Sequence, residues 1–536
     1  MKSYSEDSIQ CADALVKILE KNGIQHIFGH PGEQILPLYE SLRLSSIKHV
    51  LMRHEQGAAH AADGYARSSG KIGVCIATAG PGALNLVMGV ATAYKDSVPL
   101  LVITGDVSMK LAGGNVFQEI DLESVFKPIT IKTFNVQEGV EAISSLKLAI
   151  KMLKKGKTGP IHLNIPKNIF NQKIKYSNIF EEVEYNVNND LTNLNSALKK
   201  LENSKKPVIV VGAGVIWGGA INELEKFVKK YDIPFATTYP ARGVISEEDP
   251  LCLGMIGHRG TEAANFAGNN CDVLIGLGCR FSERTLSFIN RSEIIHVNLD
   301  PEVLIGDYKI CAPVKEVLIK IKDVDLKIDP KWLTEINHHK KYHPIRTDFN
   351  EKPLKPQKAI KEILDASDDS IIVNDAGIHT TYVTLLKKVK KPGSLIFSGG
   401  FGPMGYALPA SIGVALTRSE EKVVVIVGDG GFQMTLQEMG TIAQEKLPIL
   451  ICIINNSSLG IIKQWQDLYY HGRYAVELQN PDFVALAESY DIKATKVKST
   501  GTVMKAVRKA LHTNEPFLIE ILVDKEEGIP LPGVLE

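Results

Sequence analysis

Short apolar runs rich in β-branched residues alternate with longer segments of helical periodicity along the whole chain. This alternation is typical of parallel β-sheets whose connecting helices pack on both faces. Breaks in the pattern group the runs into three blocks, and a chain of 536 residues is long enough for three domains. We therefore expect an α/β protein with three doubly wound parallel-sheet domains, at residues 1–170, 191–330 and 356–536.

The apolar runs also predict the individual strands. In the first block we expect strands at 25–29, 48–53, 72–78, 99–105 and 160–165. In the second and third blocks we expect them at 207–214, 233–239, 273–278, 294–299, 370–374, 394–398, 423–427, 449–454, 494–498 and 516–523. The clearest amphipathic helix spans 8–22, with Ser8 as its N-cap and Gly23 as its stop. The polar segments 171–190 and 331–358 are expected to be linkers.

Composition excludes several classes of protein. Sixty-one basic residues balance sixty-one acidic ones, which argues against a nucleic-acid partner. No apolar run approaches the ~18 residues of a membrane-spanning helix, and the polar N-terminus predicts no secretory signal. The seven cysteines are scattered singly, which favours reduced thiols. We expect a soluble cytoplasmic protein that binds neither nucleic acid nor membrane.

The sharpest chemical signal lies in the third block. Gly428-Asp429-Gly430-Gly431 follows the expected strand 423–427, and Asn455-Asn456 ends the next one. In an open parallel sheet both groups fall at the carboxyl edge, where ligands bind. Asp429, Asn456 and Ser458 offer the hard oxygen ligands that suit Mg²⁺. The glycines let a diphosphate approach the backbone, and a helix opening near Phe432 points its amides at it. The alternative is an ordinary turn and an ordinary loop.

The Gly-Asp-Gly…Asn-Asn pattern resembles the thiamine diphosphate signature. The resemblance extends over nearly the whole chain and is closest to the catalytic subunits of the acetolactate (acetohydroxyacid) synthase family. The matching stretches are Phe28-Gly29-His30-Pro31-Gly32, Arg53-His54-Glu55-Gln56-Gly57-Ala58, Thr78-Ala79-Gly80-Pro81-Gly82-Ala83, Val116-Phe117-Gln118-Glu119, Ile165-Pro166-Lys167, Gly400-Phe401-Gly402-Pro403-Met404-Gly405 and Leu459-Gly460-Ile461-Ile462-Lys463-Gln464-Trp465-Gln466. The resemblance implies pyrimidine-binding, central and diphosphate-binding domains. It also implies a homodimer or tetramer with active sites between subunits, and leaves open whether a regulatory small subunit binds.

The same resemblance implies roles for cofactor-binding residues. Glu55 would contact the aminopyrimidine ring and so activate the cofactor, which supplies the carbanion chemistry. Met404 would hold the cofactor's bent shape, and His379 would donate a hydrogen bond to the diphosphate. Gly80 and Gly402 would line the cofactor site. The alternatives are a surface role for Glu55 and core packing for Met404.

On the substrate side, the resemblance places Phe117, Gln118 and Lys167 in the active-site cleft. Arg284 and Trp465 match residues that hold the second 2-oxoacid. A guanidinium suits a carboxylate, and an indole gives a flat wall for a short alkyl group. The alternatives are a surface charge for Arg284 and a core aromatic for Trp465.

The central block carries Gly212-Ala213-Gly214 after an expected strand. A nicotinamide site also needs an acidic residue at the end of the next strand, and that strand ends in Thr237-Thr238-Tyr239. A dehydrogenase is therefore disfavoured. The resembled family commonly binds FAD in this domain, and 254–261 and 298–301 are similar to its flavin-contacting segments. Asn298 replaces a usual Asp and some relatives lost the flavin, so bound FAD and no FAD both stay open.

Three functions remain to be weighed. The first is a carboligase that decarboxylates pyruvate and condenses it with a second 2-oxoacid to 2-acetolactate or 2-aceto-2-hydroxybutyrate, in branched-chain amino acid biosynthesis. The second is a 2-oxoacid decarboxylase, and the third a non-catalytic paralogue. Glu33 stands where synthases usually have Gly. It would donate a proton in a dry cleft, or else turn outward or pair with a cation such as Arg284 or Lys167.

Overall fold

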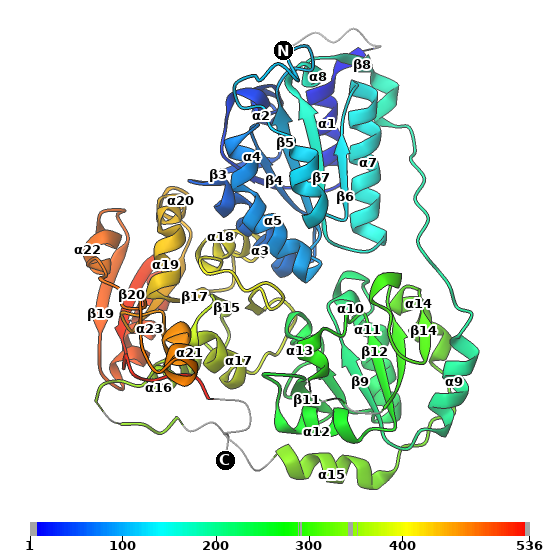
Figure 1. Cartoon of the computed structure of the whole chain (residues 1–536), viewed down its shortest axis with the longest axis vertical. Helices are drawn as coiled ribbons and strands as arrows, with labels where there is room; N and C mark the ends of the chain where they lie inside the picture. The colour runs from blue at the N-terminus through cyan, green and yellow to red at the C-terminus, as the bar shows by residue number, and fades with distance from the viewer. Residues whose placement is uncertain (1–7, 288, 290–291, 341–346, 351, 531–536) are drawn as a thin grey trace.

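The computed structural model describes residues 8–287, 289, 292–340, 347–350 and 352–530. Three six-stranded sheets form the centres of three α/β domains (Figure 1). Every pair of neighbouring strands in these sheets is parallel. The expected fold class is therefore confirmed.

The first sheet has the strand order β3-β2-β4-β5-β7-β6. Its strands are β2 (His26–Gly29), β3 (Lys48–Leu51), β4 (Gly73–Ala77), β5 (Leu100–Asp106), β6 (Lys132–Asn135) and β7 (Pro160–Pro166). Its helices are α1 (Cys11–Lys21), α2 (Leu36–Arg43), α3 (Glu55–Ser69), α4 (Pro81–Asn85), α5 (Val87–Asp96), α6 (Leu122–Phe126), α7 (Gly139–Lys155) and α8 (Lys167–Phe170). All five expected strands are present, and the edge strand β6 is additional.

The second sheet has the order β11-β10-β9-β12-β13-β14. Its strands are β9 (Pro207–Val211), β10 (Phe235–Thr237), β11 (Cys252–Met255), β12 (Val273–Leu277), β13 (Glu293–Val297) and β14 (Tyr308–Ile310). Its helices are α9 (Leu194–Asn203), α10 (Gly214–Trp217), α11 (Ile221–Tyr231), α12 (Glu262–Asn270), α13 (Glu283–Leu286), α14 (Val314–Ile321) and α15 (Pro330–Lys340). The four expected strands are its centre, and the sequence did not predict β11 and β14.

The third sheet has the order β16-β15-β17-β18-β20-β19, and all six of its strands were expected. They are β15 (Ile371–Asn374), β16 (Leu395–Ile396), β17 (Val423–Gly428), β18 (Ile449–Asn455), β19 (Lys493–Val497) and β20 (Phe517–Leu522). The helices are α16 (Pro356–Ala366), α17 (Ile378–Leu386), α18 (Ala407–Thr417), α19 (Asp429–Thr435), α20 (Met439–Gln444), α21 (Gly460–Tyr469), α22 (Phe483–Glu488) and α23 (Thr502–His512).

Four local expectations were wrong. Ser8 does not cap α1, because it lies in β1 (Ser8–Gln10), which pairs antiparallel with β8 (Lys173–Lys175). Segment 171–190 is therefore only partly a linker. Segment 331–358 contains most of α15, whose Trp332 is fully buried against the central domain. The helix expected near Phe432 begins earlier, at Asp429.

The first and third domains meet through α3 and α18, which pack directly on each other. A Cβ on Gly64 would overlap the backbone of Ala410, and one on Gly413 would overlap the carbonyl oxygen of Ala61. Glycine at these positions lets the two helix backbones approach closely. The contact belongs to one buried core that runs from the first sheet to the third.

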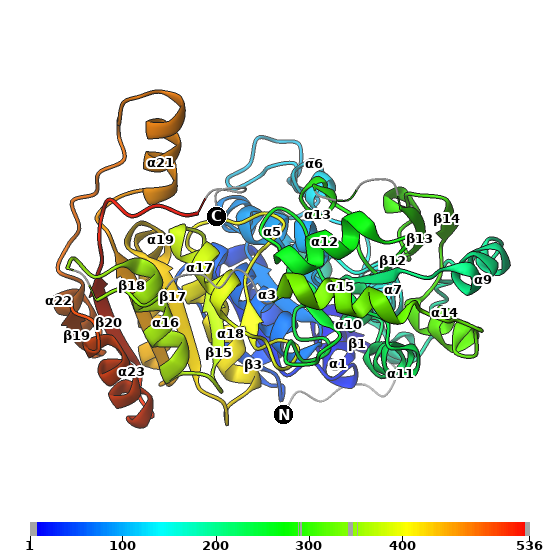
Figure 2. The ribbon, with the colours of Figure 1, turned by 90° about the horizontal axis from the view of Figure 1, so that it is seen from below.

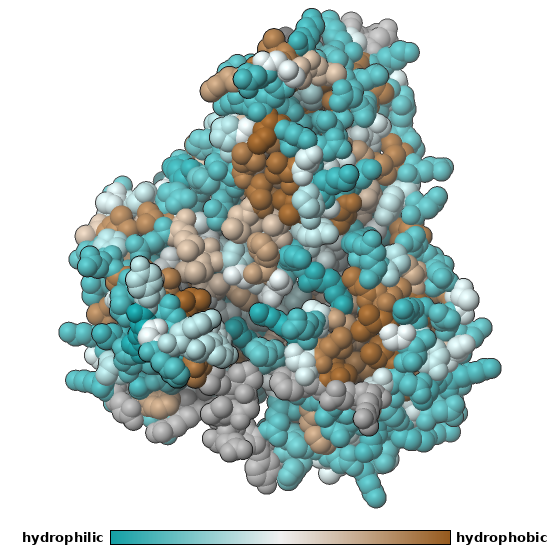
Figure 3. All heavy atoms as spheres, viewed as in Figure 1, coloured by the Kyte–Doolittle hydropathy of each residue, from teal (hydrophilic) through white to brown (hydrophobic). Residues whose placement is uncertain are grey.

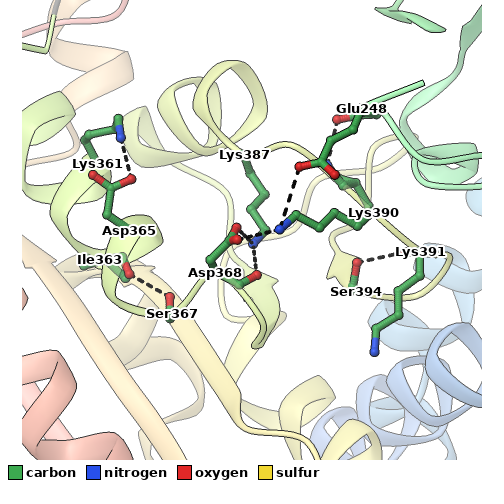
Figure 4. Close-up of polar contacts among 12 residues, drawn as sticks. Glu248, Lys361, Ile363, Asp365, Ser367, Asp368, Lys387, Lys390, Lys391 and Ser394 are labelled. Atoms are coloured by element: carbon green, nitrogen blue, oxygen red, sulfur yellow. Dashed lines mark hydrogen bonds and ion pairs between the residues drawn. The ribbon is translucent and has the colours of Figure 1, made fainter. Parts of the chain in front are cut away.

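Hydrogen bonds from a buried arginine and a surface ion pair join the central domain to the third. Arg242 pairs with Glu247 at 2.6 Å, and both side chains are almost fully buried. Arg242 also donates to the carbonyl oxygen of Thr384 at 2.8 Å, in the third domain. At the surface, Lys390 lies 2.6 Å from Asp368 and 3.8 Å from Glu248 of the central domain (Figure 4).

None of the helices in the described part of the chain has the length and apolarity needed to cross a bilayer.

The α3–α18 contact makes a prediction about stability. Gly413→Ala should lower the free energy of unfolding by about 1–3 kcal/mol, because the new methyl group overpacks the helix contact. Thermal unfolding measures the loss. The control is Gly472→Ala, at an exposed position where a Cβ would meet no atom closer than 4.0 Å. Equal melting temperatures for the two variants would contradict this account of the contact.

Candidate active site

The pairing of β17 with β18 brings the predicted metal ligands together. Gly428 is opposite Ile454, so Asp429 and Asn456 both follow their strands at the carboxyl edge of the sheet. Asp429 is 1% exposed and accepts a hydrogen bond from the backbone amide of Asn456. Asn480 also donates to Asp429, at 2.7 Å from Nδ2 to Oδ2. Asn480 was not predicted, because it lies in a loop without any recognisable motif.

The oxygen atoms of this cluster suit a hard cation. Burial raises the pKa of Asp429, and the amides around it oppose that rise. The Oγ of Ser458 is buried and has no hydrogen-bond partner among the described residues. Asn456 turns its Oδ1 toward the Ser458 amide at 3.2 Å. A nearby cation would stabilise the Asp429 carboxylate and satisfy Ser458, so the donor set fits Mg²⁺.

His379 lies beside the same turn. It is 1% exposed on α17, and its Nε2 has no partner in the part of the chain that the structure describes. Burial lowers the pKa of His379 to about 4, so the imidazole is neutral near pH 7. A Cβ on Gly428 would come within 3.4 Å of this ring, and one on Gly431 within 2.8 Å of Asp375 Oδ1. Small residues thus leave room beside a ring nitrogen without a partner, where a diphosphate would fit.

Met404 lies in a loop that buried hydrogen bonds hold in place. Asp375 accepts from the amides of Gly405 at 3.0 Å and Ala407 at 2.8 Å. Burial raises the pKa of Asp375 to about 6, against the effect of these amides. The Met404 Cε would lie 3.4 Å from a Cβ on Gly430, and the Met404 side chain is only half-buried. Met404 therefore faces the glycine turn instead of filling the core. Gly402 opens this loop in a left-handed conformation, with φ +66°.

A second cluster forms in the first domain around Glu55. Glu55 begins α3 and is 8% exposed, and Asn85 donates to its Oε2 at 2.9 Å. Asn85, on α4, was not predicted. Gly80 adopts φ +58°, and a Cβ there would be 2.7 Å from the carbonyl oxygen of Gln118. Gln118 itself has φ +68°, and its side-chain Oε1 is buried without a partner among the described residues. The cluster thus presents a carboxylate and an unused amide oxygen.

Three further predicted residues lie at the surface near this cluster. Phe117 is 77% exposed. Lys167 pairs with Glu33 at 2.9 Å, and the Glu33 side chain is 64% exposed. The ion-pair alternative for Glu33 is therefore the one found. A role for Glu33 as a proton donor in a cleft between subunits stays a prediction.

A cavity of about 880 Å³ lies between the central and third domains, and residues 96–97 and 154–158 of the first domain also line it. Its walls include the glycines Gly212 and Gly214, Asn298, and the loop 399–402. Arg284 lies on this wall, on α13, and is exposed as its surface-charge alternative predicts. Arg259 and Arg280 line the same space, and burial and the charge of Arg284 lower the pKa of Arg259. The cavity is cationic and large enough for a dinucleotide.

The alternative interpretation of Trp465 as a core aromatic does not hold, because this side chain lies outside the core. It is half-buried on α21 and stacks on Tyr469, with ring centroids 5.8 Å apart. Helix α21 stands out from the third domain (Figure 2). No interaction between described residues joins Trp465 to Arg284.

The predicted site thus forms two clusters and not one. No hydrogen bond or ion pair between described side chains links the Glu55 cluster to the Asp429 cluster. Each cluster holds a buried polar atom without a partner among the described residues: Gln118 Oε1 in the first, and Ser458 Oγ and His379 Nε2 in the second.

Comparison with known proteins follows the same division into domains. The N-terminal thiamine pyrophosphate-binding domain model matches residues 9–125 and the central-domain model residues 194–321. The C-terminal thiamine pyrophosphate-binding domain model matches residues 375–521.

Full-length relatives agree with these matches. A probable acetolactate synthase large subunit of Methanocaldococcus jannaschii is 39% identical, over 97% of this chain and 93% of the relative. The acetolactate synthase large subunit of Cyanidium caldarium is 37% identical, over 96% and 94%. That of Haemophilus influenzae is 34% identical, over 97% and 95%. With both thiamine pyrophosphate-binding domains and similarity along nearly its whole length, the chain belongs to the acetolactate synthase large-subunit family of thiamine pyrophosphate enzymes.

Proposed function

We propose that the protein is a thiamine diphosphate- and Mg²⁺-dependent carboligase. It decarboxylates pyruvate and condenses the product with a second 2-oxoacid, giving 2-acetolactate or 2-aceto-2-hydroxybutyrate for branched-chain amino acid biosynthesis. The observation that carries the proposal is a buried Glu55 together with a buried Asp429–Asn456 pair, in a chain whose relatives are named acetolactate synthase. A non-catalytic paralogue has no need of both clusters.

Each of the three domains would have a role of its own. Residues 1–170 would bind the pyrimidine of the cofactor, 191–330 would form the central domain, and 356–536 would bind the diphosphate. Asp429, Asn456 and Ser458 would hold Mg²⁺, and His379 would bind the diphosphate through Nε2, which donates once the phosphate charge favours a proton on that nitrogen. The bound cofactor supplies the carbanion chemistry. Met404 would support its central part.

Glu55 would act on a proton of the cofactor's aminopyrimidine ring. Asn85 orients one oxygen of its carboxylate, and Gly82 leaves the other open, since a Cβ there would be 3.1 Å from Oε1. For the acceptor, Arg284 would bind the carboxylate of the second 2-oxoacid and Trp465 would shape its alkyl pocket. Gln118, Phe117 and Lys167 would line the cleft.

The two clusters would complete one site only between two copies of the chain. Apolar side chains exposed near the Glu55 cluster support this: Leu36, Leu84, Met88, Leu111, Phe117 and Ile120. An apolar area covers the part of the first domain where α4 lies (Figure 3). A homodimer or a tetramer would cover such an area. The relatives' name "large subunit" also fits a smaller regulatory partner.

FAD is the ligand that best fits the cavity between the central and third domains. The arginines on its wall suit a diphosphate, and the glycines after β9 allow close approach to the backbone. An absorbance spectrum of the purified protein tests this assignment. The seven cysteines form no disulfide in the described chain, which suits a cytoplasmic location.

A 2-oxoacid decarboxylase is the competing function, and the products distinguish the two. Purified protein incubated with thiamine diphosphate, Mg²⁺ and pyruvate should accumulate acetolactate. Acetaldehyde as the main product would instead support the decarboxylase, and neither product would support a non-catalytic role. Adding 2-oxobutyrate should give 2-aceto-2-hydroxybutyrate as well, which identifies the acceptor.

The metal assignment makes a separate prediction. Asp429→Ala should weaken thiamine diphosphate binding at least about tenfold, because the diphosphate loses its Mg²⁺ anchor. Isothermal titration with Mg²⁺ present measures the affinity. Asp467→Ala is the control, since that carboxylate is exposed in the same domain. Binding as tight as in the parent protein would remove Asp429 from the metal site.

A further inference from the structure

A buried carboxylate of the third domain reaches the start of helix α3. Glu438 ends the 3₁₀ turn Leu436–Glu438, which follows α19, and it is 0% exposed. Both of its oxygens accept from the backbone amide of Arg53, at 3.2 Å. The amide of His54 donates to Oε1 at 3.1 Å, and the hydroxyl of Thr441 to Oε2 at 2.8 Å. These two amides directly precede Glu55.

The position of this carboxylate has a clear physical effect. The N-terminus of a helix carries unsatisfied amides and a partial positive charge, so an anion placed there is stabilising. Hydrogen bonds from amides to a carboxylate are also shorter and stronger than neutral ones. The backbone amide of Gln56, in the first turn of α3, donates to His54 Nδ1 at 3.1 Å. Glu438, which belongs to another domain, thus satisfies the amides of the N-cap residue His54 and of Arg53 before it.

Gly57 shows how closely the carboxylate is fitted. A Cβ on Gly57 would overlap Glu438 Oε1. Only a residue without a side chain therefore allows Glu438 to reach the amides of Arg53 and His54. This explains the glycine at the third position of α3, where its backbone freedom otherwise disfavours a helix.

Other bonds tie the same two segments together. The Arg53 guanidinium donates to the carbonyl oxygen of Gly440 at 3.2 Å and to Gln444 Oε1 at 2.9 Å. The hydroxyl of Thr441 lies 3.2 Å from the carbonyl oxygen of Leu51. Backbone and side-chain hydrogen bonds from the third domain therefore hold the segment between β3 and α3, which directly precedes Glu55. Burial raises the pKa of Glu438, which its hydrogen-bond donors counteract.

We propose that Glu438 is a positioning residue for Glu55: it fixes the backbone before α3 and so aims the catalytic carboxylate. The proposal rests on the proposed function, because it assumes that Glu55 acts on the cofactor. Glu438 touches neither cofactor nor substrate. A shift of about 1 Å in a catalytic group costs on the order of 100-fold in rate, so this support matters for turnover.

The first test uses the cofactor-free protein and does not depend on activity. Glu438→Gln removes the negative charge and one acceptor oxygen, so the Arg53 and His54 amides share one neutral oxygen and their hydrogen bonds weaken. Hydrogen exchange of the peptide spanning 50–58, followed by mass spectrometry, should become at least about tenfold faster. Glu362→Gln is the matched control. Glu362 is also buried and accepts from Gly501 and Met504 amides at the start of α23. Unchanged exchange at 50–58 in Glu438→Gln would overturn the proposal.

The second test separates positioning from binding. In Glu438→Gln, kcat should fall about tenfold or more while KM for pyruvate and the cofactor Kd stay near those of the parent. Glu362→Gln should leave all three unchanged. Loss of cofactor binding in step with kcat would overturn the positioning role. If Glu438→Gln does not fold, Thr441→Val removes one donor to the carboxylate and should shift both readouts in the same direction.

A double-variant comparison identifies the contact itself. Gly57→Ala should push the Glu438 carboxylate off the amides and lower kcat by a similar factor. In Gly57→Ala/Glu438→Ala the overlap is gone, so kcat should be no lower than in Glu438→Ala alone. If the fold-losses in kcat of the two single variants multiplied in the double variant, a contact shared by Gly57 and Glu438 would be contradicted. A parent protein without any carboligase activity would refute the proposed function, while the exchange experiment would still decide the role of Glu438.

Discussion

The close packing of α3 on α18 is the contact on which the arrangement of the first and third domains depends. Gly64 and Gly413 let the two helix backbones come so close that a side chain added at either position would overlap the facing helix. With the helices fixed in this way, the beginning of α3 meets the 3₁₀ turn that holds Glu438. The conformation of Glu55 is therefore set by its own chain, through two domains, before any partner or ligand is bound.

Buried carboxylates are the second common element of the structure. Asp375, Asp429 and Glu438 are each at most 1% exposed, and each accepts hydrogen bonds from backbone amides. Burial raises the pKa of all three. Asp375 and Glu438 hold loops, and their amide partners compensate for burial. Asp429 shares its edge of the sheet with Ser458, whose buried hydroxyl has no partner among the described residues, and this donor set fits a cation.

The sequence predicted those parts of the molecule that depend on local pattern. Central strands such as β17 and β18 are continuous apolar runs, and their parallel pairing made the meeting of Asp429 with Asn456 predictable. Three of the six edge strands, β6, β11 and β14, were not predicted: β6, for example, reads Lys-Thr-Phe-Asn and contains one large apolar residue. Asn85 and Asn480 belong to no motif, and only the folded chain brings them to the carboxylates. Pairing of Glu33 with Lys167 was an alternative that sequence alone left undecided.

The central claim is that Glu55 of one chain and Asp429 of another complete each active site. Co-expression of Glu55→Gln and Asp429→Ala chains with different tags, followed by tandem purification, yields the mixed dimer. One of its two sites then carries both substitutions and the other neither, so acetolactate formation should be about half that of the parent dimer. If both residues served a site within one chain, every site would be defective. Activity of the mixed dimer no higher than that of either variant alone would contradict the account.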